Sequence, residues 1–562
     1  MNIPFVAGHF EHDANICFEY EDKLYSYELE RITKERYFNI GSPSGWSRCL
    51  AIFEQFKHIL LQEFDVSEIT VDILMYNEDL AWDVKHGKST VPETFQSIFN
   101  VKEIYEYGHH DAHAACAFGS SPFEESIVIS YDGGGTKGGV RGFANTVPLW
   151  EFFVIYHADR GGLTRLVSLP VNMGGFYNTL CSAPKEVQWS GFSMAGCGKL
   201  MGLSGHANPD PLLVNRLKSS FFDNPFYHKD GRSMDLRDYW LSLELFESRY
   251  NIEKPEYSMK DYPVTERYDP VLDLIDSFEH CADYASNWQE AFTQIILELI
   301  EPYVSKYNLP ICLSGGCALN VLTNERIRTH FNKPVYVPPN PSDCGLAMGA
   351  FYLRYPNFKG DVVYQNFDLL DRHKLQIYAM HYNAVICDIP TLADIIVDGK
   401  IVGVANGRSE CGPRALGNRS ILCNPSIPDM KDTLNAKVKQ REWYRPFAPM
   451  VRYEDRNTYF NFDGDSPYMS FACTVRKQYQ KELSAITHID GTARIQTVTK
   501  DQNSFIYDLL TEIEHKGEIP VLLNTSFNIK GKPILTSIED SLYILNNTEM
   551  DNVYIEGHLF GG

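Results

Sequence analysis

The chain has 562 residues, which at roughly 100 to 200 residues per unit predicts two to four packed units. It carries 51 Lys and Arg against 73 Asp and Glu, a net charge of -22 that disfavours a duplex nucleic acid partner and a membrane surface. The composition, 44% hydrophobic and 13% aromatic, is typical of a globular protein and excludes the disordered and fibrous classes.

No stretch reaches the ~18 to 20 uninterrupted apolar residues that a membrane span needs. The opening MNIPFVAGHFEHDANICF has His, Glu and Asp where a signal peptide has an apolar run, so we expect a cytoplasmic protein with no membrane partner. The 13 cysteines form no Cys-x-x-Cys pair, which disfavours a zinc ribbon or disulfide framework and predicts reduced, mostly buried thiols.

The segment GHHDAHAACAF predicts a helix with metal-binding potential. On a helix, His109 and His113 project from one face at the spacing with which two imidazoles hold one metal ion, whereas His110 points elsewhere. Such a pair is also typical of surface or core-edge histidines, so alone it is a weak signal.

The next segment, SIVISYDGGGTKGGVRGFA, predicts a strand, a tight glycine turn and a second strand. Asp132 ends the first strand and leads directly into the glycines that begin at Gly133. A carboxylate at this position is typical of ligand sites in open α/β sheets, although an ordinary Asp-Gly hairpin turn is the alternative.

The segment GCGKLMGLSGH places Lys199 among glycines, as a candidate phosphate partner or as a solvated loop lysine. The chain from about residue 205 to 287 is rich in Tyr, Phe, Asp and Lys and is weakly periodic. We expect it to be an inserted, mainly helical substrate lobe.

The segment LPICLSGGCALNVLTNERI predicts a strand, a glycine turn and a helix. Its LSGGCALN run, with Gly315, Gly316 and Asn320, is a candidate nucleotide site where the helix start faces a phosphate. Tight packing explains the paired glycines nearly as well. Strands that alternate with helices in this way indicate an α/β fold.

The segment PVYVPPNPSDCGLAMGAFYL repeats the pattern, and Ser342 or Asp343 is well placed to cap its helix. Asp343 is alternatively a second carboxylate beside Asp132. Together with His109 and His113, the two carboxylates would form a site suited to iron, manganese or zinc.

A change in composition near residues 364–371 predicts a boundary between residues 1–365 and 366–562. Before it lies a small-residue helix that ends in Pro and Gly, and after it strand-like segments begin with ICDIP and KIVGVAN.

Residues 401–452 are basic within an acidic chain. They contain nine Lys and Arg against four acids (Glu410, Asp429, Asp432 and Glu442), a net charge of +5. The basic residues are Arg408, Arg414, Arg419, Lys431, Lys437, Lys439, Arg441, Arg445 and Arg452. Several lie in the Gly/Pro-shaped loops GRSECGPRALGNRS and VKQREWYRPFAP, which favours convergent guanidinium groups that bind phosphate over a solvated basic face. Further donors follow: Arg494, Asn524, Thr525, Ser526 and Asn528. We therefore expect a small, highly phosphorylated ligand in the second half.

These motifs, in this order, resemble the O-carbamoyltransferases of the NodU/CmcH type, relatives of the nebramycin aminoglycoside carbamoyltransferase. The resemblance covers nearly the whole chain, through HDAN, HHDAH, YDGGG, GKLMGLSG, LSGGCALN, NPSDCGLAMGA, GPRALGNRSIL, VKQREWYRPFAP, DGTARIQTV and LLNTSFN.

The resemblance implies an N-terminal domain of the actin/hexokinase/Hsp70 (ASKHA) type and a C-terminal YrdC-like α/β domain. It implies that ATP, with Mg²⁺, and carbamoyl phosphate form carbamoyl-AMP in the C-terminal domain. The N-terminal domain, with a divalent metal for which Fe²⁺ is the first choice, then passes the carbamoyl group to a hydroxyl of a small molecule such as a sugar, an antibiotic or a hydroxymethylated nucleotide.

Site residues are also implied by the resemblance. The metal ligands would be His109, His113, Asp132 and Asp343. His12 would be the base. The contacts with carbamoyl phosphate and ATP would be Arg414, Lys439, Arg445, Arg494 and Thr525.

The chain departs from the family pattern twice. VAGHFEHDAN leaves His9 as a competitor of His12 for the role of base, and AGCGKLMGLSGH makes the nucleotide contacts around Lys199 less secure. Both departures lie near the expected acceptor.

Three alternatives stay open. A kinase with the same fold would use Asp132 as its base, but needs neither the histidine pair nor the arginine-rich half. A non-catalytic nucleotide-binding scaffold leaves the second domain without a role. Hydrogenase-maturation carbamoyltransferases carry Cys-x-x-Cys zinc fingers, which are absent here. A homodimer is an open option.

Overall fold

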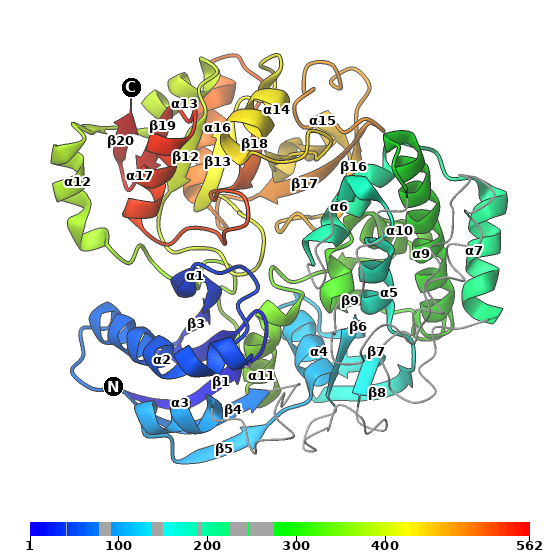
Figure 1. Ribbon diagram of the computed structural model, residues 1–562, viewed down its shortest axis with the longest axis horizontal. Helices are drawn as coiled ribbons and strands as arrows, with labels where there is room; N and C mark the ends of the chain where they lie inside the picture. Colours follow the sequence, from blue (N-terminus) through cyan, green and yellow to red (C-terminus); the bar gives the residue numbers. More distant parts are fainter. Residues whose placement is uncertain are drawn as a thin grey trace.

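The computed structural model describes residues 1–40, 42–77, 91–136, 150–187, 194–223, 246 and 275–561. The described strands form two five-stranded sheets in the N-terminal part and one ten-stranded sheet in the C-terminal part, with helices against them (Figure 1). The predicted mixed α/β class is confirmed.

The first sheet has the order β3-β2-β1-β4-β5. Strands β1, β2 and β3 are antiparallel neighbours, whereas β4 and β5 continue parallel to β1. Their bounds are β1 Asn2–His9, β2 Asn15–Tyr20, β3 Lys23–Glu28, β4 Thr70–Asn77 and β5 Glu103–Glu106.

The second sheet repeats this arrangement, with the order β8-β7-β6-β9-β10 and the same strand directions. Its bounds are β6 Glu125–Thr136, β7 Trp150–Asp159, β8 Gly162–Leu169, β9 Ile311–Ser314 and β10 Val335–Tyr336. The N-terminal part thus contains one sheet topology twice, which the sequence analysis did not predict.

Two helices connect the repeated sheets. Helix α4 (His109–Gly119) follows β5 of the first sheet but packs on β6 and β9 of the second, and α11 (Leu346–Arg354) follows β10 of the second but packs on β1 and β2 of the first. The helices also pack against each other. At their contact a Cβ on Gly349 would lie 1.9 Å from the Ala112 carbonyl oxygen, so only glycine permits this approach.

The ten-stranded sheet has the order β11-β20-β19-β12-β13-β18-β14-β17-β16-β15. Its bounds are β11 Val385–Ile386, β12 Val402–Ala405, β13 Arg419–Cys423, β14 Ala448–Arg452, β15 Phe460–Asn461, β16 Phe471–Val475, β17 Thr492–Val498, β18 Val521–Ser526, β19 Asn552–Ile555 and β20 His558–Gly561. The boundary at 365/366 falls between α11 and this sheet and stays a prediction.

Helices of two or more turns cover the sheets, joined by a few single turns. The remaining α-helices are α1 Glu30–Thr33, α2 Pro43–Glu63, α3 Val91–Phe99, α5 Met173–Leu180, α6 Ala195–Ser204, α7 Pro211–Asp223, α9 Phe278–Tyr307, α10 Val321–Phe331, α12 Leu375–His381, α13 Ile389–Val397, α14 Met430–Thr433, α15 Arg456–Tyr459, α16 Ser504–His515 and α17 Ile538–Asn547. Within the described part of the chain, none is long and apolar enough to cross a membrane.

Three local expectations need comment. The predicted turn at Gly133 is wrong, because β6 continues to Thr136 through a bulge between Tyr131 and Gly135. The predicted loop around Lys199 is wrong, because this segment forms helix α6. Most of the predicted lobe 205–287 lies outside the described residues, and its described parts include α7 and the start of α9.

The contact between α4 and α11 predicts a strong effect of a single methyl group. Gly349→Ala should lower the free energy of unfolding by about 2 kcal/mol or more, because the helices must separate. The matched control is Gly198→Ala on α6, where a Cβ meets no atom within 4 Å and should stabilise the helix by about 0.5–1 kcal/mol. Urea unfolding of both variants measures the difference, and equal midpoints would contradict the prediction.

Candidate metal centre and anion site

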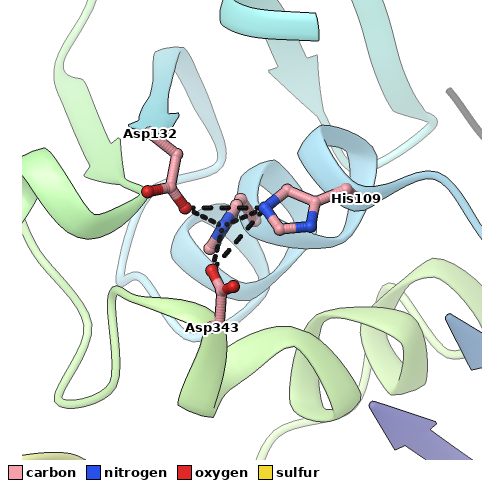
Figure 2. A group of neighbouring side chains, drawn as sticks. His109, Asp132 and Asp343 are labelled. Atoms are coloured by element: carbon pink, nitrogen blue, oxygen red, sulfur yellow. Dashed lines mark hydrogen bonds and ion pairs between the residues drawn. The ribbon is translucent and has the colours of Figure 1, made fainter. Parts of the chain in front are cut away.

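Four predicted side chains converge between the repeated sheets. His109 and His113 come from α4, Asp132 from β6, and Asp343 from the short helix Asp343–Gly345 that precedes α11. One donor atom of each lies within 4.8 Å of the other three. Figure 2 shows His109, Asp132 and Asp343 pointing toward one another.

The distances between donor atoms fit a single cation. His113 Nε2 lies 2.9 Å from Asp132 Oδ2, 3.2 Å from Asp343 Oδ1 and 3.0 Å from His109 Nε2. Adjacent ligands around an ion with bonds of about 2.0–2.2 Å have comparable separations. Imidazole and carboxylate ligands together suit iron, manganese or zinc, so these residues fit the predicted divalent metal.

Burial makes the unbalanced charge of this group costly. Burial raises the pKa of Asp132, but hydrogen bonds from His109 and His113 lower it by more, to well below its usual range. Burial and the nearby Asp132 charge raise the pKa of Asp343, which His109 and His12 oppose. Two buried carboxylates that repel each other in this way are stabilised by a cation between them.

The backbone explains why these side chains meet. The β6 bulge pairs Tyr131 with Phe153 and Gly135 with Glu151, and it leaves Asp132 outside the regular ladder, beside the α4 histidines. The hairpin-turn alternative for Asp132 is therefore wrong. The helix-cap alternative for Asp343 is also wrong, since its side chain faces the histidines and α11 has no side-chain cap.

His110 fixes the helix that carries the ligands. It points away from the site, as its spacing predicts, with Nδ1 2.7 Å from Ser130 Oγ and Nε2 2.9 Å from the Glu151 carbonyl oxygen. Burial and the neighbouring His109 and His113 lower its pKa well below the usual range. This neutral imidazole therefore joins α4 to β6 and β7.

Two further histidines lie at the end of β1. His12 Nε2 is 3.2 Å from Asp343 Oδ2, its Nδ1 is 3.3 Å from Asp13 Oδ2, and its side chain is 22% exposed. Burial lowers the pKa of His12, but the charges of Asp343 and Asp13 raise it by more, to about 10. His9 is fully buried, with Nε2 3.1 Å from the His12 carbonyl oxygen. Both candidates thus lie beside the metal ligands, and His12 is the more accessible.

A second group of side chains, the cation cluster, lies in the C-terminal half. Its members are Arg414, Lys439, Arg441, Arg445 and Arg494. Burial and the charges of fellow members lower the pKa of Lys439, Arg441 and Arg494 well below their usual ranges. Burial and Arg36 lower the pKa of Arg414 to about 10. Lys439 is buried and the four arginines are half-buried, and cations gathered in this way favour the binding of an anion.

Few anions among the described residues balance the cluster. Lys439 Nζ donates to oxygens of Ser526 and Asn528, at 2.7 Å and 2.6 Å, and Arg441 Nε donates to Asn435 Oδ1 at 2.7 Å. Among the described residues, one ion pair involves the cation cluster: Arg445 pairs with Glu442 at 3.5 Å. Glu442 is itself neutralised by Lys199 at 2.9 Å.

Two other arginines of the basic segment have structural partners. Arg408 pairs with Glu63 and stacks on Tyr25, and Arg419 is fully buried, donating to backbone carbonyls such as that of Asn418 at 2.8 Å. Of the arginines in GRSECGPRALGNRS, Arg414 belongs to the cation cluster, and its phosphate-binding role stays a prediction.

The remaining candidates lie close to one of the two sites. Gly315, with φ of +90°, would place a Cβ 2.2 Å from the Tyr131 carbonyl oxygen, and Gly316 would place one 2.9 Å from Asp132 Oδ1. Asn320 Oδ1 caps α10 by accepting from the Thr323 amide at 3.1 Å. Thr525 lies half-buried in β18, one residue before Ser526. Tight packing therefore accounts for the glycines, and the nucleotide role of all four stays a prediction.

The fold and sites together define a mixed α/β protein with a candidate metal centre and a separate anion site. Residues 68–352 match the family described as Carbamoyltransferase N-terminus, and residues 393–561 match Carbamoyltransferase C-terminus. The chain belongs to this carbamoyltransferase family.

Relatives match over most of the chain. Nodulation protein NolNO of Sinorhizobium fredii is 28% identical over 91% of this chain and 71% of its own length. Nodulation protein NolO of Bradyrhizobium diazoefficiens is 30% identical over 80% of this chain and 77% of its own length. Among solved structures, T. kodakarensis HypF is 16% identical, with a TM-score of 0.32 over 64% of this chain and 48% of its own.

The hydrogen bonds of His110 predict that it controls metal affinity without being a ligand. His110→Ala should weaken binding of a divalent metal about 10- to 100-fold, because α4 is no longer fixed to the strand that carries Asp132. Calorimetric titration with Zn²⁺ or Mn²⁺ measures this. The control is His157→Ala, a histidine paired with Glu125 at the rim of β7, which should bind normally.

Proposed function

We propose that the protein is an O-carbamoyltransferase that works in two chemically distinct steps at two sites. The observation that carries this proposal is the separation of charge among the described residues. Buried or half-buried cations with few paired anions gather in the C-terminal half, and buried or half-buried carboxylates and imidazoles gather in the N-terminal half. The cations of the C-terminal half suit the binding of phosphates, and the carboxylates and imidazoles of the N-terminal half suit the binding of a metal cation.

The fold supports the same division. We propose that residues 1–365 adopt the actin/hexokinase/Hsp70 type of fold, which the repeated five-stranded sheets support. We assign residues 366–562 to a YrdC-like domain, and the single large sheet with its helices is compatible with that class.

In the first step, carbamoyl phosphate and ATP, with Mg²⁺, would give carbamoyl-AMP. The atom balance needs one water: hydrolysis of carbamoyl phosphate releases phosphate and carbamate, whose oxygen attacks the α-phosphorus of ATP and displaces pyrophosphate. Arg414, Lys439, Arg445 and Arg494 would bind the phosphate oxygens and stabilise the charge that develops on them. Thr525 would contribute a donor at the end of β18.

In the second step, an acceptor hydroxyl would attack the carbamoyl carbon, and the bond to AMP would break. A divalent metal held by His109, His113, Asp132 and Asp343, which we take to be Fe²⁺, would supply Lewis-acid polarisation of the carbonyl. His12 would take the hydroxyl proton. The charge of Asp343 raises the pKa of His12. A cation that neutralises Asp343 would remove this effect and favour the neutral form of the His12 imidazole, which is the form that can act as a base.

The acceptor is proposed to be a small molecule, such as a sugar, an antibiotic or a hydroxymethylated nucleotide, and the location to be cytoplasmic. A kinase of the same fold or a nucleotide-binding scaffold would leave the cation cluster without a ligand. Carbamoyl-phosphate-dependent exchange of labelled pyrophosphate into ATP distinguishes the proposal from both, because it requires a reversible adenylation.

Variants at the two sites should separate the steps. Arg414→Ala should reduce pyrophosphate exchange at least 100-fold, because the anhydride-forming site loses a cation whose pKa is lowered by burial and by the charge of neighbouring arginines. His109→Ala should keep exchange within about threefold of wild type and lose carbamoyl transfer. Arg326→Ala, which removes an exposed partner of Glu290, is the control for both assays. Equal loss of both activities in the two site variants would contradict the two-site assignment.

Removal of the metal from the His/Asp site should also separate the two steps. After chelation and dialysis, Mg²⁺ alone should restore pyrophosphate exchange but not carbamoyl transfer, since only the second step uses the His/Asp site. Transfer should return on addition of Fe²⁺, with Mn²⁺ and Zn²⁺ as comparisons. Full transfer by metal-depleted enzyme with Mg²⁺ alone would show that the His/Asp site is not catalytic.

A further inference from the structure

A buried asparagine joins the two halves of the chain. Asn324 lies in the first turns of α10, and its side chain is fully buried. Its Nδ2 group donates to the Ala318 carbonyl at 2.7 Å and to the Ser470 carbonyl at 3.0 Å, and its Oδ1 accepts from the Tyr131 hydroxyl at 3.3 Å. Because a carbonyl oxygen can only accept, the two carbonyls fix which way the amide faces. One side chain therefore connects three segments that are far apart in the sequence.

Two of these contacts lie beside the metal centre. Tyr131 is fully buried and directly precedes Asp132, and it is the last residue of β6 that pairs with β7 before the bulge. Its bond to Asn324 therefore holds the strand where Asp132 leaves the ladder. The turn that contains Ala318 packs on the same tyrosine, since a Cβ on Gly315 would lie 2.2 Å from the Tyr131 carbonyl oxygen. Asn324 thus bonds to both the strand end that carries Asp132 and the turn that packs against this strand end.

The third contact leads to the cation cluster. Ser470 directly precedes β16, and its amide donates to Ser466 Oγ at 3.2 Å. Ser466 Oγ in turn donates to the Ile495 carbonyl at 2.8 Å. Ile495 lies next to Arg494 in β17, the strand that pairs with β16. Asn324 is therefore connected, through Ser470 and Ser466, to the strand that carries a member of the cation cluster.

A purely structural role is the alternative, because α10 also contacts the C-terminal half at its surface. Helix α10 packs against β16 (Figure 1), and Arg328 pairs with Asp463 at 2.7 Å. The Asp463 side chain is 82% exposed, and an exposed ion pair contributes little to stability. The buried amide of Asn324 restricts the two strands more strongly, since each hydrogen bond that is lost leaves a buried polar group unsatisfied.

We propose that Asn324 is a positioning residue that sets the position of Asp132 relative to Arg494, and thereby the position of the metal centre relative to the anion site. The inference rests on the proposed function and deepens it, because the carbamoyl group has to pass from one site to the other. Asn324 would act through Tyr131 on the metal side and through Ser470 on the anion side, rather than by contact with a substrate.

The first test measures the two sites separately, by calorimetry on the full-length protein. Mn²⁺ is the probe of the His/Asp site, and inorganic pyrophosphate is the probe of the cation cluster. Asn324→Ala should raise both Kd values about 3- to 30-fold, because both strands lose a hydrogen bond to the same amide. The matched control is Asn287→Ala on α9, which removes a fully buried asparagine that bonds to Asp283 and to the Asp210 amide. It should leave both Kd values within about twofold.

Two deletions of a single hydroxyl separate the two sides. Tyr131→Phe removes the hydroxyl that bonds to Asn324 and should raise the Kd for Mn²⁺ alone. Ser466→Ala removes the group that joins Ser470 to β17 and should raise the Kd for pyrophosphate alone. A role in stability alone would lower the melting temperature of these variants and leave both Kd values unchanged, and that result would overturn the proposal. The two variants also decide the question if Asn324→Ala does not fold.

The second test is kinetic. In the pyrophosphate exchange assay, Asn324→Ala and Ser466→Ala should raise the KM for carbamoyl phosphate about 3- to 30-fold and lower kcat less, while Asn287→Ala keeps the wild-type values. An unchanged KM in both Asn324→Ala and Ser466→Ala would contradict the proposal. If wild-type protein binds Mn²⁺ and pyrophosphate but shows no exchange, the proposed function fails, while the calorimetric test of Asn324 still stands.

Discussion

The close contact between α4 and α11 is the constraint on which the metal centre depends. Each helix leaves one of the repeated sheets and packs on the other, and Gly349 lets their backbones approach without an intervening side chain. His109 and His113 lie on α4, and Asp343 directly precedes α11. The contact between these two helices therefore sets the distance between the histidines and Asp343. The β6 bulge then supplies Asp132 from a third direction.

Charge is distributed in the opposite sense at the two sites. Within a chain of net charge -22, buried and half-buried cations gather around Arg414 and Lys439, and the carboxylates Asp132 and Asp343 gather around His113. Each group is unfavourable by itself, since burial removes the solvation of like charges. The same imbalance makes one group a candidate site for phosphate anions and the other a candidate site for a divalent cation.

The sequence allowed part of this arrangement to be predicted. The α/β class, the helix that begins at His109 and the four metal-binding candidates follow from local patterns, namely helical spacing and a carboxylate at a strand end. The repeated sheet was not predictable, because the two copies share strand order and direction rather than residues. The bulge at Asp132 was missed because glycines after a strand are typical of turns, while here β7 continues to pair with them.

The basic segment shows the same limit. An excess of positive charge over residues 401–452 predicts an anion site, but it does not indicate which of the nine cations lie together. Arg408 lies in this segment but pairs with Glu63, 345 positions away in the chain. No local pattern encodes such a contact.

The exchange of helices between the two sheets also has a consequence for biosynthesis. Helix α4 leaves the ribosome early, but the sheet on which it packs is complete only after β10, and Asp343 follows that strand. The His/Asp set therefore cannot exist on a nascent chain shorter than about residue 343. Until then the two histidines and Asp132 lack Asp343, so a metal ion that needs all four ligands would bind only late in synthesis.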